Sequence, residues 1–78
     1  MDIALPEVGD RILLSRDALV EVASTFPGAP KIWQYLAAGS RGRLIGWRDR
    51  AQSCAVVDVD GGERRLVVFV REASVEVA

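Results

Sequence analysis

Hydrophobic and polar residues alternate most regularly in the second half of the chain, where the pattern predicts three β-strands. These strands span, in chain order, Gly42 to Trp47, Ser53 to Val59 and Glu63 to Val70. Asp60-Gly61-Gly62 joins the last two strands and supplies the positive φ angles that a tight hairpin requires. A turn over Arg71 to Ser74 then leads to a final short strand, Val75 to Val77.

The first half of the chain alternates less regularly. Val8 to Leu14 is predicted as the first strand, with Val8 and Ile12 on the same face as Leu14. Ser15 to Ser24 fits either a capped helical turn or an extended arm, and Phe26 to Pro30 is predicted as a turn. The first connection is therefore long.

A short helix is predicted within this connection, over Lys31 to Ala38. Pro30 suits the first turn of a helix, and Gly39 stands where a helix C-cap belongs. The apolar residues between them have mixed helical spacing.

The composition indicates a single globular domain over residues 1–78, with residues 1–6 expected to be flexible. Half of the residues are hydrophobic and 27% are charged, which excludes general disorder. At 78 residues the chain is near the lower limit for a core without disulfides or a metal, so self-association is an expected aid. A net charge of -1 provides no strong field toward nucleic acid or an anionic membrane.

Localisation in the cytoplasm is expected. Cys54 is the only cysteine, which excludes an intramolecular disulfide and fits a small buried side chain in a strand. The N-terminal residues lack the apolar stretch of a signal peptide. The apolar run Leu66 to Val70 is too short to cross a bilayer, so no membrane partner is expected.

Most catalytic chemistry is excluded by residue type. The chain has no histidine, which removes Ser-His and Cys-His nucleophile activation. One cysteine cannot build a zinc or iron-sulfur site. Asp58 and Asp60 fit an acid/base pair or a hard-cation site, but an outward strand residue beside a turn residue is the favoured interpretation. We therefore predict no catalytic residues, no metal and no cofactor.

The segment Gly39 to Asp49 (GSRGRLIGWRD) is rich in glycine and arginine. Its glycine spacing matches neither the phosphate-binding loop nor the dinucleotide fingerprint, and it precedes a strand rather than a helix. A barrel corner is the favoured interpretation, with Gly46 at a bulge or a close backbone approach.

Four arginines lie close together in this region, at positions 41, 43, 48 and 50, and Trp47 lies among them. Arg64 and Arg65 approach from the neighbouring hairpin. Such a cluster fits nucleic-acid binding, although a solvated or oligomer-contacting face is favoured over it.

The strand Leu66 to Val70 is apolar on both faces, with Val67 and Phe69 on the second one. A small barrel has one interior, so the second face requires a cover: the Lys31 to Ala38 helix, another subunit or a target protein. We predict a homo-oligomer, with a protein partner as a further option.

Five strands with a long first connection that carries a short helix predict a mainly β fold, a five-stranded SH3-like barrel. Val8 to Ile12 (VGDRI) and Gly39 to Trp47 (GSRGRLIGW) resemble segments of such barrels in the nitrile hydratase β-subunit and the plasmid-encoded type II dihydrofolate reductases. The matching residues are mostly glycine and apolar, so they specify a fold and not a reaction.

The reductase resemblance implies a homotetramer whose central pore binds folate and NADPH, with a V-Q-I-Y segment and a nearby lysine. The matching strand here, Arg65 to Val70, contains neither Gln nor Tyr, and Lys31 gives no firm match. The favoured function is a non-enzymatic binding or assembly module. The alternatives are a small oligomeric enzyme with a ligand pore at its symmetry axis, and a nucleic-acid-binding barrel. The predicted contact residues are Trp33, Tyr35, Arg41, Arg43, Trp47, Arg48, Arg50, Arg65, Val67 and Phe69.

Overall fold

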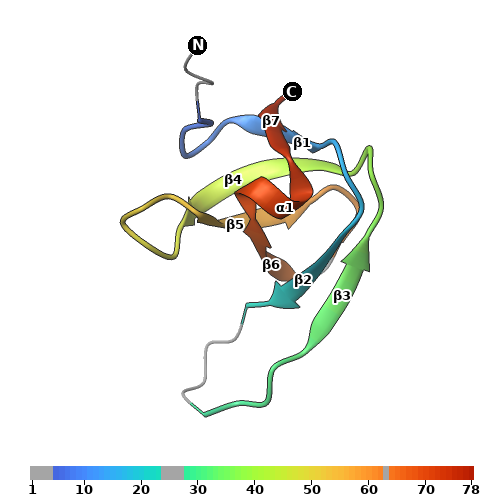
Figure 1. Ribbon diagram of the computed structural model, residues 1–78, viewed down its shortest axis with the longest axis vertical. Helices are drawn as coiled ribbons and strands as arrows, with labels where there is room; N and C mark the ends of the chain where they lie inside the picture. The colour runs from blue at the N-terminus through green and yellow to red at the C-terminus, as the bar shows by residue number, and fades with distance from the viewer. Residues whose placement is uncertain (1–4, 24–27, 63) are drawn as a thin grey trace.

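The computed structural model describes residues 5–23, 28–62 and 64–78, and this part of the chain is mainly β (Figure 1). Its strands form one antiparallel seven-stranded sheet in the order β3-β2-β6-β5-β4-β1-β7. The elements are β1 (Arg11–Leu14), β2 (Ala18–Val22), β3 (Trp33–Leu36), β4 (Arg41–Trp47), β5 (Cys54–Val59), β6 (Arg65–Phe69), α1 (Val70–Ala73) and β7 (Val75–Val77). The sheet is not closed, because β3 and β7 stand at opposite ends of that order.

Several predictions fall partly outside the described residues. They concern residues 1–4 of the segment expected to be flexible, the first part of the predicted turn Phe26 to Pro30, and Glu63 at the start of a predicted strand.

The strands predicted in the second half are confirmed, with small shifts at their ends. β4, β5 and β6 correspond to the three predicted strands, and β7 has the predicted bounds. The predicted turn before β7 is replaced by the one-turn helix α1, which Ser74 ends in a left-handed conformation at φ 51°.

The first strand is shorter than predicted. It begins at Arg11, and Val8 lies in a preceding turn in which the Asp10 amide donates to the Glu7 carbonyl at 2.9 Å. Gly9 makes this turn possible with φ 96°, a conformation that costs a side-chain-bearing residue energy. Val8 is consequently 60% exposed and does not face the core with Ile12 and Leu14.

The helix predicted over Lys31 to Ala38 is wrong, because this segment contains strand β3. β3 pairs antiparallel with β2, so the first connection carries an arm of two strands (Figure 1). The open choice for Ser15 to Ser24 is resolved as the extended arm over its described residues, 15–23, while Ser24 lies outside the described part of the chain. A short apolar run fits the periodicity of a helix as well as that of a strand. The strand forms here because pairing with β2 satisfies backbone N–H and C=O groups that a short isolated helix would leave unpaired. The described strands therefore number seven, not five.

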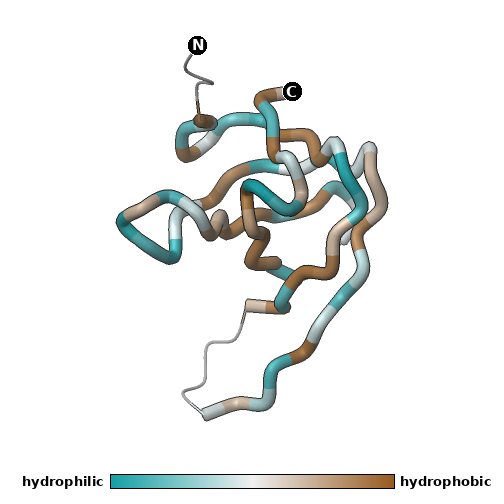
Figure 2. The backbone as a smooth tube through the Cα atoms, viewed as in Figure 1, coloured by the Kyte–Doolittle hydropathy of each residue, from teal (hydrophilic) through white to brown (hydrophobic). Residues whose placement is uncertain are grey.

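One hydrophobic core lies on the inner face of the sheet. Leu36 of β3 and Val75 of β7 belong to the same buried cluster, so the sheet curves until its two edge strands pack on a common interior. The hydrophobic parts of the chain gather where β4, β5, β6 and α1 meet (Figure 2). Val70 and Ala73 of α1 cover this interior from one end.

Candidate interaction surface

The outer face of the sheet carries a continuous row of registered residues across five strands. Glu21 of β2 stands opposite Trp33 on one side and Val67 on the other, and Val67 stands opposite Val56, which faces Gly46 of β4. Residues that are directly opposite on paired strands share one face of the sheet. Five strands therefore build this face.

The β2–β3 end of this face is aromatic and exposed. Leu19 stands opposite Tyr35 in the next row, on the same side as Trp33. The exposed fractions are 48% for Trp33, 61% for Tyr35 and 57% for Leu19. The sequence left open whether Trp33 and Tyr35 are core or contact residues; both are exposed, and contact with a partner stays a prediction. We define these three residues as the arm surface.

Val67 differs from the prediction, because the chain itself covers it. Its side chain is only 2% exposed, between Glu21 of β2 and Val56 of β5. A second subunit is therefore not needed to bury this residue. Phe69, two residues further along the same face, keeps 37% of its surface exposed.

An ion pair between Arg48 and Glu21 lies in the middle of the outer face. Glu21 is a buried charged residue on β2, and Arg48 from the loop after β4 places Nη1 3.3 Å from its Oε2. The Arg48 side chain is half exposed, so it covers the carboxylate while keeping contact with water. Arg48 therefore already has a carboxylate partner, Glu21, within the chain.

Trp47 does not lie on the outer face. It stands opposite Ala55, which is fully buried, and it packs against the core cluster. The register of β4 with β5 shifts between Leu44 and Gly46, which is a β-bulge. The extra residue reverses the alternation beyond it, so Trp47 turns inward instead of outward. The sequence had suggested a bulge near Gly46 but not this consequence.

The predicted arginine cluster is divided between the two ends of β4. Arg41 and Arg43 lie in the strand, whereas Arg48 and Arg50 follow its end, and a seven-residue strand spans roughly 20 Å. Arg43 instead shares a row with Arg11, Asp58 and Arg65. The single predicted cluster is therefore two separate groups, Arg41 with Arg43 and Arg48 with Arg50.

The carboxylates Asp58 and Asp60 are held by arginines. Arg65 Nε lies 3.6 Å from Asp58 Oδ1, and Arg11 Nη1 donates to Asp60 Oδ1 at 3.0 Å. The hydrogen bond from Arg11, with the nearby charges of Arg41 and Arg43, lowers the pKa of Asp60 from its ordinary value of 3.8. Within the described ranges no group of three potential metal ligands occurs.

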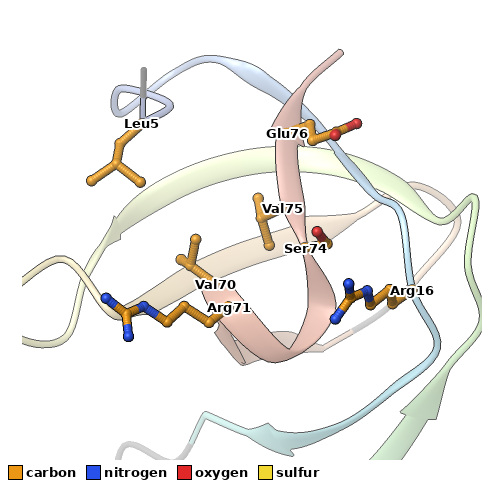
Figure 3. Close-up of a pocket in the computed structure, with 7 residues that line it drawn as sticks. All are labelled: Leu5, Arg16, Val70, Arg71, Ser74, Val75 and Glu76. Atoms are coloured by element: carbon orange, nitrogen blue, oxygen red, sulfur yellow. The ribbon is translucent and has the colours of Figure 1, made fainter. Parts of the chain in front are cut away.

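A pocket of about 320 Å³ lies beside α1, on residues that sequence reasoning did not single out (Figure 3). Val70 and Val75 form an apolar wall. The Arg71 side chain extends from α1 on one side, and Arg16, from the connection between β1 and β2, lies on the other side of α1. The remaining lining residues are Leu5, Ser74 and Glu76. Three segments distant in the sequence meet here, so no local pattern identifies this pocket.

The loop that positions Arg48 is organised by Asp49. Its carboxylate accepts hydrogen bonds from the Ser53 amide at 3.1 Å, the Cys54 amide at 3.0 Å and the Ser53 hydroxyl. These bonds, first that from the Ser53 side chain, lower the pKa of Asp49 from 3.8. Asp49 therefore links β5 to the residue that covers Glu21.

We expect Asp49→Asn to destabilise the protein at neutral pH and to weaken its sensitivity to acid. A carboxyl whose pKa is lowered by folding stabilises the native state above the unfolded pKa, near 3.8, and this stabilisation is lost as the pH falls through the folded pKa. Urea unfolding at pH 7 and at pH 3 measures both effects. Ser53→Ala leaves the two amide donors in place and should give a smaller change; an equal acid sensitivity of wild type and Asp49→Asn would contradict this role.

Comparison with protein-family models, curated proteins and solved structures finds no match to this chain. In the described part of the structure, no helix has the length and apolarity needed to span a membrane.

Proposed function

We propose that this chain is an SH3-like barrel that serves as a non-enzymatic assembly module and self-associates through its β2–β3 arm. The observation that carries the proposal is the arm surface, in which Leu19, Trp33 and Tyr35 are each about half exposed or more on one face. Trp and Tyr are enriched where proteins bind one another, because each buries a large area at little entropic cost.

The connectivity of the fold supports the SH3-like part of the proposal. β4, β5 and β6 are neighbours in the sheet in chain order, and β1 lies between β4 and β7. After β5 the chain turns, with the Gly62 amide donating to the Val59 carbonyl at 2.9 Å, and the one-turn helix α1 precedes β7. The arm is then the elaborated first connection that such barrels carry.

The size of the chain supports self-association. A domain of 78 residues buries a smaller share of its surface on folding than a larger domain does. Exposed aromatic surface is therefore unfavourable for its stability, and an oligomer would bury that surface. The other face of the arm already serves the core, since Val20 and Leu36 are buried there. The arm surface is therefore left for a partner.

The test is the solution mass of the untagged protein, measured by light scattering on a sizing column at low and high salt. We expect a dimer or larger oligomer that persists at high salt, because apolar contacts are not screened. Trp33→Ser should shift the protein toward the monomer. Val8→Ser removes a similarly exposed apolar side chain from the turn before β1 and should leave the mass unchanged. A wild-type monomer at all concentrations would overturn the proposal.

A further inference from the structure

One edge of β3 carries backbone hydrogen-bonding groups with no partner strand among the described strands. β3 is the last strand in the sheet order and pairs only with β2 among the described strands. It forms the outer boundary of the molecule on that side (Figure 1). We propose that a second copy of this chain adds its own β3 antiparallel to this edge, about a two-fold axis at Gln34. This inference rests on the proposed self-association and specifies its geometry.

The backbone groups that point outward from β3 follow from its pairing with β2. The Val22 amide donates to the Ile32 carbonyl at 2.8 Å, which makes this a hydrogen-bonded pair of the ladder. Such pairs alternate along antiparallel strands, so Gln34 also bonds toward β2. The N–H and C=O groups of Trp33 and Tyr35 therefore point away from β2, toward the free edge.

One register satisfies all four of these groups within β3. Trp33 of each copy then faces Tyr35 of the other, and each such pair exchanges two hydrogen bonds. Shifting the partner to place Tyr35 opposite Tyr35 would bring Trp33 against Ala37, whose carbonyl already accepts from the Ser40 amide at 3.2 Å and its hydroxyl at 2.6 Å. The opposite shift would place Ile32 against the polar Gln34.

The favoured register also matches side chains of like character. On the outer face it puts Trp33 beside the aromatic ring of Tyr35 from the second copy, and aromatic cross-strand pairs are stabilising. On the inner face it puts Ile32, which is 50% exposed, opposite Leu36, which is 6% exposed. Two further exposed apolar side chains, one in each copy, thus gain an apolar neighbour.

Charge favours a second copy of this chain as the occupant. Strands at sheet edges are commonly protected by charged residues or proline, and β3 itself (WQYL) has neither. Lys31 would lie opposite Ala37 of the other copy, next to Asp17, whose carboxylate accepts from the adjacent Ala38 amide at 2.7 Å. The two-fold operation forms this Lys31–Asp17 contact twice.

A disulfide across the axis tests the geometry. In a Cys54→Ala background, Gln34→Cys leaves one thiol per chain, on the two-fold axis. Non-hydrogen-bonded pairs of antiparallel strands have Cα atoms about 4.5 Å apart, within the range that a disulfide spans. We expect mild oxidation to link most of this variant as a dimer. Lys31→Cys in the same background is the matched control; its two thiols would be roughly 20 Å apart, so we expect about tenfold less linked dimer.

Proline provides a second readout on the backbone. Tyr35→Pro removes an outward N–H without removing a donor to β2, and proline is tolerated on edge strands. Tyr35→Thr loses the same ring but keeps the N–H. We expect Tyr35→Pro to be monomeric by light scattering at concentrations where Tyr35→Thr still associates. Circular dichroism of both variants confirms that the sheet is retained.

The outcomes separate this inference from the proposed function. A monomeric wild type overturns both. An oligomer that is not linked by Gln34→Cys and that Tyr35→Pro leaves intact overturns edge pairing while self-association stands. Efficient linkage by Trp33→Cys instead of Gln34→Cys overturns the proposed register.

Discussion

Gly42→Ala is expected to destabilise the fold by about 3 kcal/mol, at the upper end of the usual cost of forcing extra atoms into a packed site. A Cβ atom at position 42 would lie 2.3 Å from the Asp58 carbonyl oxygen and 3.0 Å from both the Asp58 carbonyl carbon and Val59 Cα. These are backbone atoms of β5, paired with β4 at this point. They cannot move aside as a side chain would, so the two strands must separate.

Thermal and urea unfolding measure this effect. For a domain of this size, about 3 kcal/mol lowers Tm by roughly 12 to 24 °C. Gly46→Ala is the matched control in the same strand, because a Cβ there meets no atom within 4 Å. We expect it to change the free energy of unfolding by less than about 0.5 kcal/mol. Equal losses for the two variants would contradict a close β4–β5 approach at Gly42.

Leu44→Ala should have a comparable effect for the opposite reason, because it leaves a cavity. Leu44 is fully buried in the middle of β4 and belongs to the core cluster. Replacing a buried leucine by alanine costs about 2 to 5 kcal/mol, the sum of lost burial and an incompletely filled cavity. A small domain has little stability in reserve, so this loss leaves a substantial unfolded fraction at ambient temperature.

The control for Leu44→Ala is the same substitution at Leu19, which is 57% exposed on the arm surface. Its cost should be below about 1 kcal/mol, since most of the side chain is already in water. Both variants are compared by urea unfolding at the same protein concentration, so that self-association contributes to the same extent to both free energies of unfolding. Similar losses at the two positions would mean that the arm surface is a second core.

Local pattern was sufficient where an element is specified by its own residues. The alternation in β5 and β6 and the glycines between them define both strands and their turn, because side-chain direction and positive φ are properties of the residues themselves. Trp33 and Tyr35 are exposed, on a strand rather than on the predicted helix, and their role as contact residues stays a prediction. Their alternation in β3 also places them on one face.

The remaining assignments depended on which strands meet. Lys31 to Ala38 contains a strand because β2 offers it a partner, a long-range interaction that a short apolar run does not reveal. A bulge opposite β5 turned Trp47 inward, and neighbours on β2 and β5 buried Val67. The sequence by itself thus determined the mainly β class, the hairpin and the aromatic contact candidates. Only the tertiary structure decided which of those side chains reach solvent, because register and curvature arise between strands and not within them.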